Sequence, residues 1–74
     1  MTTYAIKHDD GRWWDGKGWH AVTGKLYKLG ELPAFLDMGD GTILGSHSFY
    51  RLGGVRIAVE YFVDAQLVAT AEEV

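Results

Sequence analysis

The stretch SHSFYRLGGVRIAVEYFV, residues 46–63, decides the fold that this sequence predicts. Apolar and polar side chains alternate along residues 55–63, which is the period of a strand with one buried face. Gly53 and Gly54 separate this run from the one before it, and a two-residue glycine loop between two such runs is typical of a β-hairpin. We therefore predict that residues 46–52 and 55–63 pair as antiparallel strands.

The two-residue loop fixes the register of this hairpin, because directly opposed residues carry their side chains on the same face. The predicted pairs are Leu52–Val55, Arg51–Arg56, Tyr50–Ile57, Phe49–Ala58, Ser48–Val59 and His47–Glu60. The predicted core face is apolar and comprises Leu52, Tyr50, Val55, Ile57, Val59 and Tyr61. A slip of one residue would turn this whole set to solvent. Phe62 lies on the opposite face.

A second hairpin is predicted at the start of the chain, over residues 3–15. Residues 3–8 alternate as a strand does, and Asp9-Asp10-Gly11 has the composition of a turn from which the chain returns. Asp15-Gly16 is a dipeptide favoured in tight hairpin turns, so a third short strand is expected over residues 19–22.

One short helix is predicted near residues 31–38. Pro33 suits the first turn of a helix, where its missing N–H costs nothing. Leu32, Phe35 and Leu36 form an apolar stripe at helical spacing, and Gly39 is placed to end the helix as a left-handed cap.

The C-terminal residues 65–73 form either a helix or a strand. Asp64 could cap a helix that carries Leu67 and Val68 on one side, and the alanine-rich composition favours this interpretation. A last strand over residues 66–70 is the alternative. The predicted fold is therefore a single small domain over residues 1–74, α+β and β-dominated, with an antiparallel sheet of about four or five short strands.

Composition limits the environment and the chemistry that can be expected. The chain has 74 residues, 47% of them hydrophobic, and no cysteine, which excludes disulfides and thiolate zinc sites. No apolar run approaches the roughly 18 residues of a membrane helix, and the first residues do not read as a signal peptide. We expect a cytoplasmic protein that does not contact a membrane.

Charge is distributed unevenly along the chain. The net charge is −3, which argues against nucleic acid as a general partner. Residues 1–28 carry five basic and three acidic side chains, whereas residues 29–74 carry two basic and seven acidic ones. Such a chain could pair head to tail with a copy of itself, or use its basic half on an anionic partner.

All three tryptophans lie in the segment GRWWDGKGWH, residues 11–20. Trp13 and Trp14 are adjacent, so in a strand they point to opposite faces, one into the core and one half-exposed. The segment is either the cap of a small core or a contact surface. In the second case Trp13, Trp14 and Trp19, helped by Lys7, Arg12 and Lys17, would stack on a sugar or on single-stranded nucleic acid.

Two arginines are predicted to face each other near the hairpin turn. Arg51 and Arg56 would be direct cross-strand neighbours, and like charges in that position are unfavourable. Either an acidic side chain, a bound anion or a second subunit offsets the repulsion, or both side chains extend into water.

The sequence contains no arrangement typical of catalysis or of metal binding. The candidate ligands lack the spacing of a metal motif, so we expect no metal site; they are His8, Asp9, Asp10, His20 and His47. No nucleophile, base and acid cluster in the sequence, so we expect no enzymatic activity and no cofactor.

The predicted function is that of a small non-enzymatic binding module whose partner is a protein or a second copy of itself. An isologous homodimer through residues 55–63 or through the face of Phe62 is expected, because twofold dimers are the commonest assemblies. The alternative is a module that binds carbohydrate or single-stranded nucleic acid on its tryptophans. The candidate binding residues are Trp13, Trp14, Trp19, Arg12, Lys17, Arg51, Arg56 and Phe62.

Overall fold

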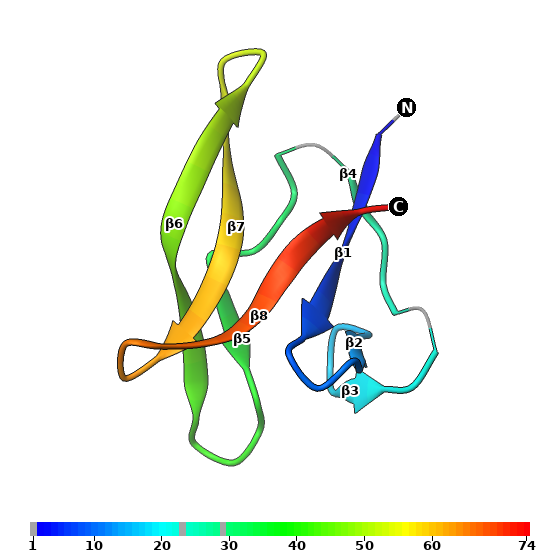
Figure 1. The fold of residues 1–74 in the computed structure, drawn as a ribbon, viewed down its shortest axis with the longest axis vertical. Coiled ribbons are helices and arrows are strands. Elements are labelled where there is room, and N and C mark those ends of the chain that lie inside the picture. Colours follow the sequence, from blue (N-terminus) through cyan, green and yellow to red (C-terminus); the bar gives the residue numbers. More distant parts are fainter. Residues whose placement is uncertain (1, 23, 29) are drawn as a thin grey trace.

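The computed structural model describes residues 2–22, 24–28 and 30–74, and shows one antiparallel sheet that curls strongly into half a barrel (Figure 1). The strands are β1 (Thr3–His8), β2 (Trp13–Trp14), β3 (Trp19–His20), β4 (Tyr27–Lys28), β5 (Phe35–Asp37), β6 (Ile43–Leu52), β7 (Val55–Val63) and β8 (Gln66–Glu73). Their order across the sheet is β3-β2-β1-β8-β7-β6-β5, and β4 also pairs with β1. The described residues include no helix, so the predicted α+β class with four or five strands is wrong and the fold is all-β.

The hairpin of β6 and β7 has the predicted register near its turn. Four pairs agree with the prediction, from Leu52–Val55 to Phe49–Ala58, and Gly53 and Gly54 both have positive φ, 58° and 82°. Farther from the turn, two irregularities shift the register, so that Ser48 opposes Glu60. The predicted Ser48–Val59 and His47–Glu60 pairs are therefore wrong. A bulge inserts one extra residue into a strand, and nothing in the alternation of these residues marks where that happens.

The predicted helix over residues 31–38 is wrong, because this segment forms β5 at the edge of the sheet. Leu36 pairs with Leu44 on the inner face, and each is only 2% exposed. Two hydrogen bonds flank this pair: Ser46 N–H of β6 donates to Ala34 O, and Met38 N–H donates to the carbonyl of Thr42, the residue before β6. A helix of two turns is marginal on its own, whereas the extended segment gains main-chain hydrogen bonds and the buried Leu36–Leu44 contact from the hairpin with β6.

The preferred C-terminal helix is also wrong, because residues 66–73 form β8. This strand lies between β1 and β7 and so joins the two halves of the sheet (Figure 1). Asp64, expected to cap a helix, instead forms the β7–β8 turn with Ala65, at φ values of 47° and 65°. The intrinsic helix preference of an alanine-containing sequence is a weak determinant of structure. Here the pairing of β8 with β1 on one side and β7 on the other outweighs it.

The core fills the concave side of the curled sheet. It contains aromatic and aliphatic side chains from both halves, among them Tyr4, Ile6, Trp14, Tyr27, Leu36, Leu44, Ile57 and Tyr61. In the predicted core face, Ile57 and Tyr61 are buried and Val59 is half-buried. The side chains of Tyr50, Leu52 and Val55 lie outside what the structure describes. Within the described ranges, no helix is long and apolar enough to cross a membrane.

Candidate functional site

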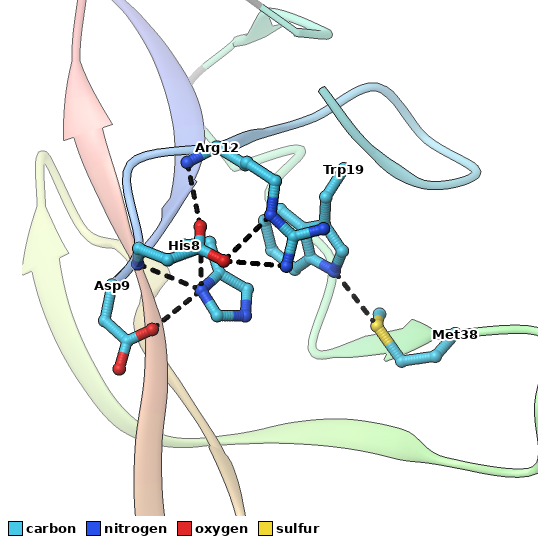
Figure 2. A network of polar contacts seen from close by, with 6 residues as sticks. His8, Asp9, Arg12, Trp19 and Met38 are labelled. Carbon is cyan, nitrogen blue, oxygen red and sulfur yellow. Dashed lines mark hydrogen bonds and ion pairs between the residues drawn. The ribbon is translucent and has the colours of Figure 1, made fainter. Parts of the chain in front are cut away.

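Two of the three tryptophans close the core at the open side of the half-barrel. Trp14 is 3% exposed, and the half-buried Trp19 ring lies 5.1 Å from it between ring centroids. Trp19 Nε1–H donates to the Sδ atom of Met38 over 3.3 Å, which links β3 to the residue after β5 (Figure 2). These two side chains therefore cap the core.

Trp13 points to the other face, as the adjacency of the two tryptophans predicts. It is half-buried, and Lys7 Nζ lies 5.2 Å from the centroid of its ring. The ammonium group over this ring is a cation–π contact. The tryptophans thus do not gather into one open aromatic surface.

Arg12 takes part in a polar network at the turn between β1 and β2 (Figure 2). Its guanidinium contacts Asp10 Oδ2 through both Nε and Nη2 at 2.8 Å, and this hydrogen bond is the main reason that the pKa of Asp10 is lowered. His8 Nδ1 lies 2.7 Å from Asp9 Oδ1 and also within 3.1 Å of the Asp10 N–H. Nδ1 can donate to the carboxylate when it carries a proton, or accept from the N–H when it does not. The network holds the turn in shape.

The candidate metal ligands lie in three places: His8, Asp9 and Asp10 are together at the β1–β2 turn, and His20 and His47 each lie elsewhere. His8 contacts Asp9, His20 Nε2 lies 2.6 Å from Asp15 Oδ2, and the His47 ring packs against Phe62 at 5.2 Å between centroids. Over the part of the chain that the structure describes, no group of three or more such side chains could hold a metal ion.

The remaining predicted basic residues, Lys17, Arg51 and Arg56, are exposed. Lys17 lies in the loop between β2 and β3, where its N–H donates to Asp15 Oδ1. Arg51 and Arg56 are direct cross-strand partners, as predicted, but their guanidinium groups diverge. Arg56 lies 3.8 Å over the ring of Phe49, and Arg51 Nη1 donates to the carbonyl of Gly54 at 3.4 Å.

Phe62 belongs to an apolar surface that crosses four strands on the outer face. The register aligns Phe35 of β5, Gly45 of β6, Phe62 of β7 and Leu67 of β8 in one row. Gly45 leaves room for a neighbour, and a Cβ atom there would meet the Phe35 ring at 3.6 Å. Ile43 precedes Gly45 by two residues and so shares this face.

We call this surface the outer patch, formed by Phe35, Ile43, Phe62 and Leu67. Phe35 is 69% exposed, Ile43 56% and Leu67 39%, whereas Phe62 is half-buried. The sequence pattern indicated Phe62 alone. Phe35 was missed because its segment was predicted as a helix, and Leu67 because a helix was preferred to the alternative of a last strand.

The surroundings of the outer patch are acidic. Residues 31–47 and 60–74, which include β5, β8 and the nearer ends of β6 and β7, contain seven acidic residues and no lysine or arginine. Asp37 follows Phe35 by two residues on β5, Asp40 lies in the β5–β6 turn, and Asp64 lies in the β7–β8 turn. Backbone donation from Thr42 lowers the pKa of Asp40 and so favours its charged form. We call Asp37, Asp40 and Asp64 the acidic rim.

A shallow pocket of about 250 Å³ adjoins the outer patch at Leu67. It lies where the end of β1 pairs with β8, and Lys7, Asp9, Thr70 and Glu72 contribute to its lining. Its mixture of charges does not favour one ligand chemistry, so it extends the surface of the patch and does not define a separate site.

Comparison of the chain with protein-family models, with curated proteins and with solved structures found no match, so the geometry of the outer patch is what bears on function.

Proposed function

We propose that this chain is a small protein-binding module whose partner docks on the outer patch. The observation that carries the proposal is the row of Phe35, Phe62 and Leu67 across β5, β7 and β8, with the exposed Ile43 beside it. Large apolar side chains that are contiguous on a surface and framed by polar residues are typical of protein interaction sites. An apolar centre with a charged rim is the usual anatomy of such an interface.

A protein partner fits the outer patch better than a sugar or a nucleic acid fits the tryptophans. Stacking on a sugar or a base needs an open aromatic face, whereas Trp14 and Trp19 pack together in the cap of the core. Trp13 is half-buried beneath Lys7. The acidic rim would also repel phosphate groups.

Selection of short random peptides displayed on phage tests the proposal. The protein is immobilised, and the enriched peptides are measured against two double variants. F35S/I43S removes the two most exposed members of the patch. V22S/L26S removes two apolar side chains that are also exposed, at 73% and 50%, but lie outside the patch.

We expect the enriched peptides to bind the V22S/L26S variant as they bind the unaltered protein. We expect about a tenfold or larger loss of affinity with F35S/I43S, because burying one large apolar side chain stabilises a complex by roughly 1.5–3 kcal/mol. Circular dichroism would confirm that both variants stay folded. Equal binding to both variants, or a selection that enriches no peptide, would overturn the proposal.

A further inference from the structure

β5 is an edge of the sheet: within the described residues no strand pairs with its side away from β6, and Trp19 contacts Met38 just after the strand ends. It ends the strand order next to β6. Ala34 hydrogen-bonds to Ser46 of β6 and Met38 to Thr42 just before β6, and in an antiparallel pair the bonding residues alternate. The N–H and C=O groups of Phe35 and Asp37 therefore point away from β6.

The edge lacks the lysines and inward-pointing charges that commonly protect sheet edges, although β5 itself is short. Lysines and inward-pointing charges on an edge strand prevent the addition of another strand. β5 instead has Leu36 facing inward and the exposed Phe35 facing outward, with Asp37 as its one charged residue. Pro33 lies before the strand and leaves all three of its residues able to donate.

Charge identifies the kind of chain that this edge would accept. Asp37 and Asp40 flank the free edge, and no lysine or arginine occurs in residues 31–47 or 60–74. A twofold dimer through this edge would bring the acidic rims of two copies together, which like-charge repulsion disfavours. A cationic chain would be attracted to the same place.

We infer that the outer patch and the β5 edge bind a basic segment of a protein partner in an extended conformation. This inference rests on the proposed function and specifies the partner. The segment continues the sheet: its main chain hydrogen-bonds with Phe35 and Asp37, as in strand addition generally. Its apolar side chains pack on Phe35 and Ile43, and its lysines or arginines approach Asp37 and Asp40.

Two synthetic peptides of about ten residues, a length that spans a whole strand, test the inference. One alternates lysine with valine, and the other alternates glutamate with valine. Each is titrated into the isotopically labelled protein, and backbone amide shifts and amide hydrogen exchange are followed by NMR. We expect the lysine peptide alone to shift the amides of residues 35–37 and 43–45 and to slow exchange at Phe35 and Asp37.

Two charge variants test whether the acidic side chains beside β5 attract the peptide. The double variant D37N/D40N keeps the oxygens that accept from the Gly39 and Thr42 N–H groups but removes both charges. We expect this variant to bind the lysine peptide with an affinity about fivefold or more lower than that of the unaltered protein. Glu73→Gln is the matched control, because Glu73 is exposed on β8 opposite Tyr4, remote from β5 in the strand order.

Several outcomes would overturn the inference while leaving the proposed function in place. Equal affinity for the lysine and glutamate peptides would show that charge does not select the bound segment. Shifts at the patch without protection of Phe35 and Asp37 would exclude strand addition. Concentration-dependent self-association lost in a β5 variant would identify a second copy as the occupant. A failure of the proposed function itself would appear separately, in the F35S/I43S comparison.

Discussion

At the scale of single residues, Tyr61 connects two parts of the core that are far apart in sequence. Its side chain is fully buried, and its hydroxyl donates to the carbonyl of Pro33 over 2.7 Å. Tyr61→Phe keeps the ring and leaves that carbonyl without its partner, so we expect it to reduce the free energy of unfolding by about 1–2 kcal/mol. Urea denaturation of the two proteins measures this difference. A loss of only a few tenths of a kcal/mol would mean that a water molecule replaces the hydroxyl as the partner of the Pro33 carbonyl.

Gly24 is the glycine at which space, not conformation, demands the absence of a side chain. A Cβ atom there would lie 1.9 Å from the carbonyl oxygen of Trp14, which already accepts a hydrogen bond from the Lys25 N–H at 2.8 Å. Gly24→Ala forces these segments apart, and we expect a loss of about 2 kcal/mol or more. Gly18→Ala is the matched control, because nothing lies within 4 Å of its Cβ position. Equal melting temperatures for the two variants would contradict the close approach.

Ala65 occupies a conformation that suits glycine. It has a φ of 65° in the β7–β8 turn, where a Cβ atom is sterically unfavourable by roughly 1–2 kcal/mol. We expect Ala65→Gly to stabilise the protein by about 0.5–1 kcal/mol, since the flexibility of glycine in the unfolded chain offsets part of the gain. The control is Ala71→Gly inside β8, where the same change should destabilise. Thermal unfolding of both variants measures these effects. A lower melting temperature for Ala65→Gly than for the unaltered protein would contradict the prediction.

At the scale of elements, the β6–β7 hairpin depends on its two-glycine turn. Gly53 and Gly54 both have positive φ, as turns between twisted strands require. Replacing both by alanine places two Cβ atoms in the left-handed region, so we expect a loss of about 2–4 kcal/mol. The matched control is Arg51→Ala at the same end of the hairpin, where Arg51 makes one long hydrogen bond and should contribute little. A double variant as stable as the control would show that the turn has another geometry.

The hairpin could be predicted near its turn and not farther away, for a physical reason. A two-residue loop fixes the pairs beside it, such as Leu52–Val55 and Arg51–Arg56, by chain geometry alone. The bulges that put Ser48 opposite Glu60 bend the strand and so belong to the curl of the sheet, which involves all the strands together.

The segment predicted as a helix and the C-terminal segment, where a helix was preferred to a strand, show the same limit. Residues 35–37 and 66–73 carry apolar side chains at spacings compatible with a helix, and their strand state comes from the partners beside them. Because β5 and β8 supply Phe35 and Leu67, the outer patch could not be found before these strands were placed. Phe62 could be placed on the outer face from the sequence alone, since it lies on a strand whose alternation of apolar and polar residues is clear.

At the scale of the whole molecule, contacts between distant segments hold the curled sheet. β8 pairs with β1 and with β7, and Val74 N–H donates to Thr3 O where the two ends of the chain meet. Across the open side, Trp19 contacts Met38, and Tyr61 reaches Pro33. Curling encloses the core and leaves the outer face of β5–β8 uncovered, where Phe35, Ile43 and Leu67 are exposed.

The ionisable groups of the folded state set the pH range in which this structure is stable. Burial raises the pKa of Tyr61 and of Tyr27, so the folded state disfavours their ionised forms. Below the unfolded tyrosine pKa of about 10 the contribution of these tyrosines to the free energy of unfolding is fully present, and it is lost as pH rises toward the higher pKa values of the folded state.

Hydrogen bonds lower the pKa of Asp10, Asp15 and Asp40. Arg12 is the main cause at Asp10, and backbone N–H groups are the main cause at the other two. Their contribution is present above the unfolded aspartate pKa of about 3.9 and declines as pH falls below it.

We therefore expect the free energy of unfolding to be nearly constant between about pH 5 and pH 9 and to fall on both sides. The alkaline decline is expected to be the steeper, because Tyr61 is fully buried whereas the three aspartates are exposed and screened by solvent. Urea denaturation at a series of pH values measures both arms, and the absorbance of tyrosinate locates the alkaline one. In the Tyr61→Phe variant the alkaline decline should shrink and the acid decline should stay. An unchanged alkaline decline in that variant would place the sensitive group elsewhere, with Tyr27 the next to test.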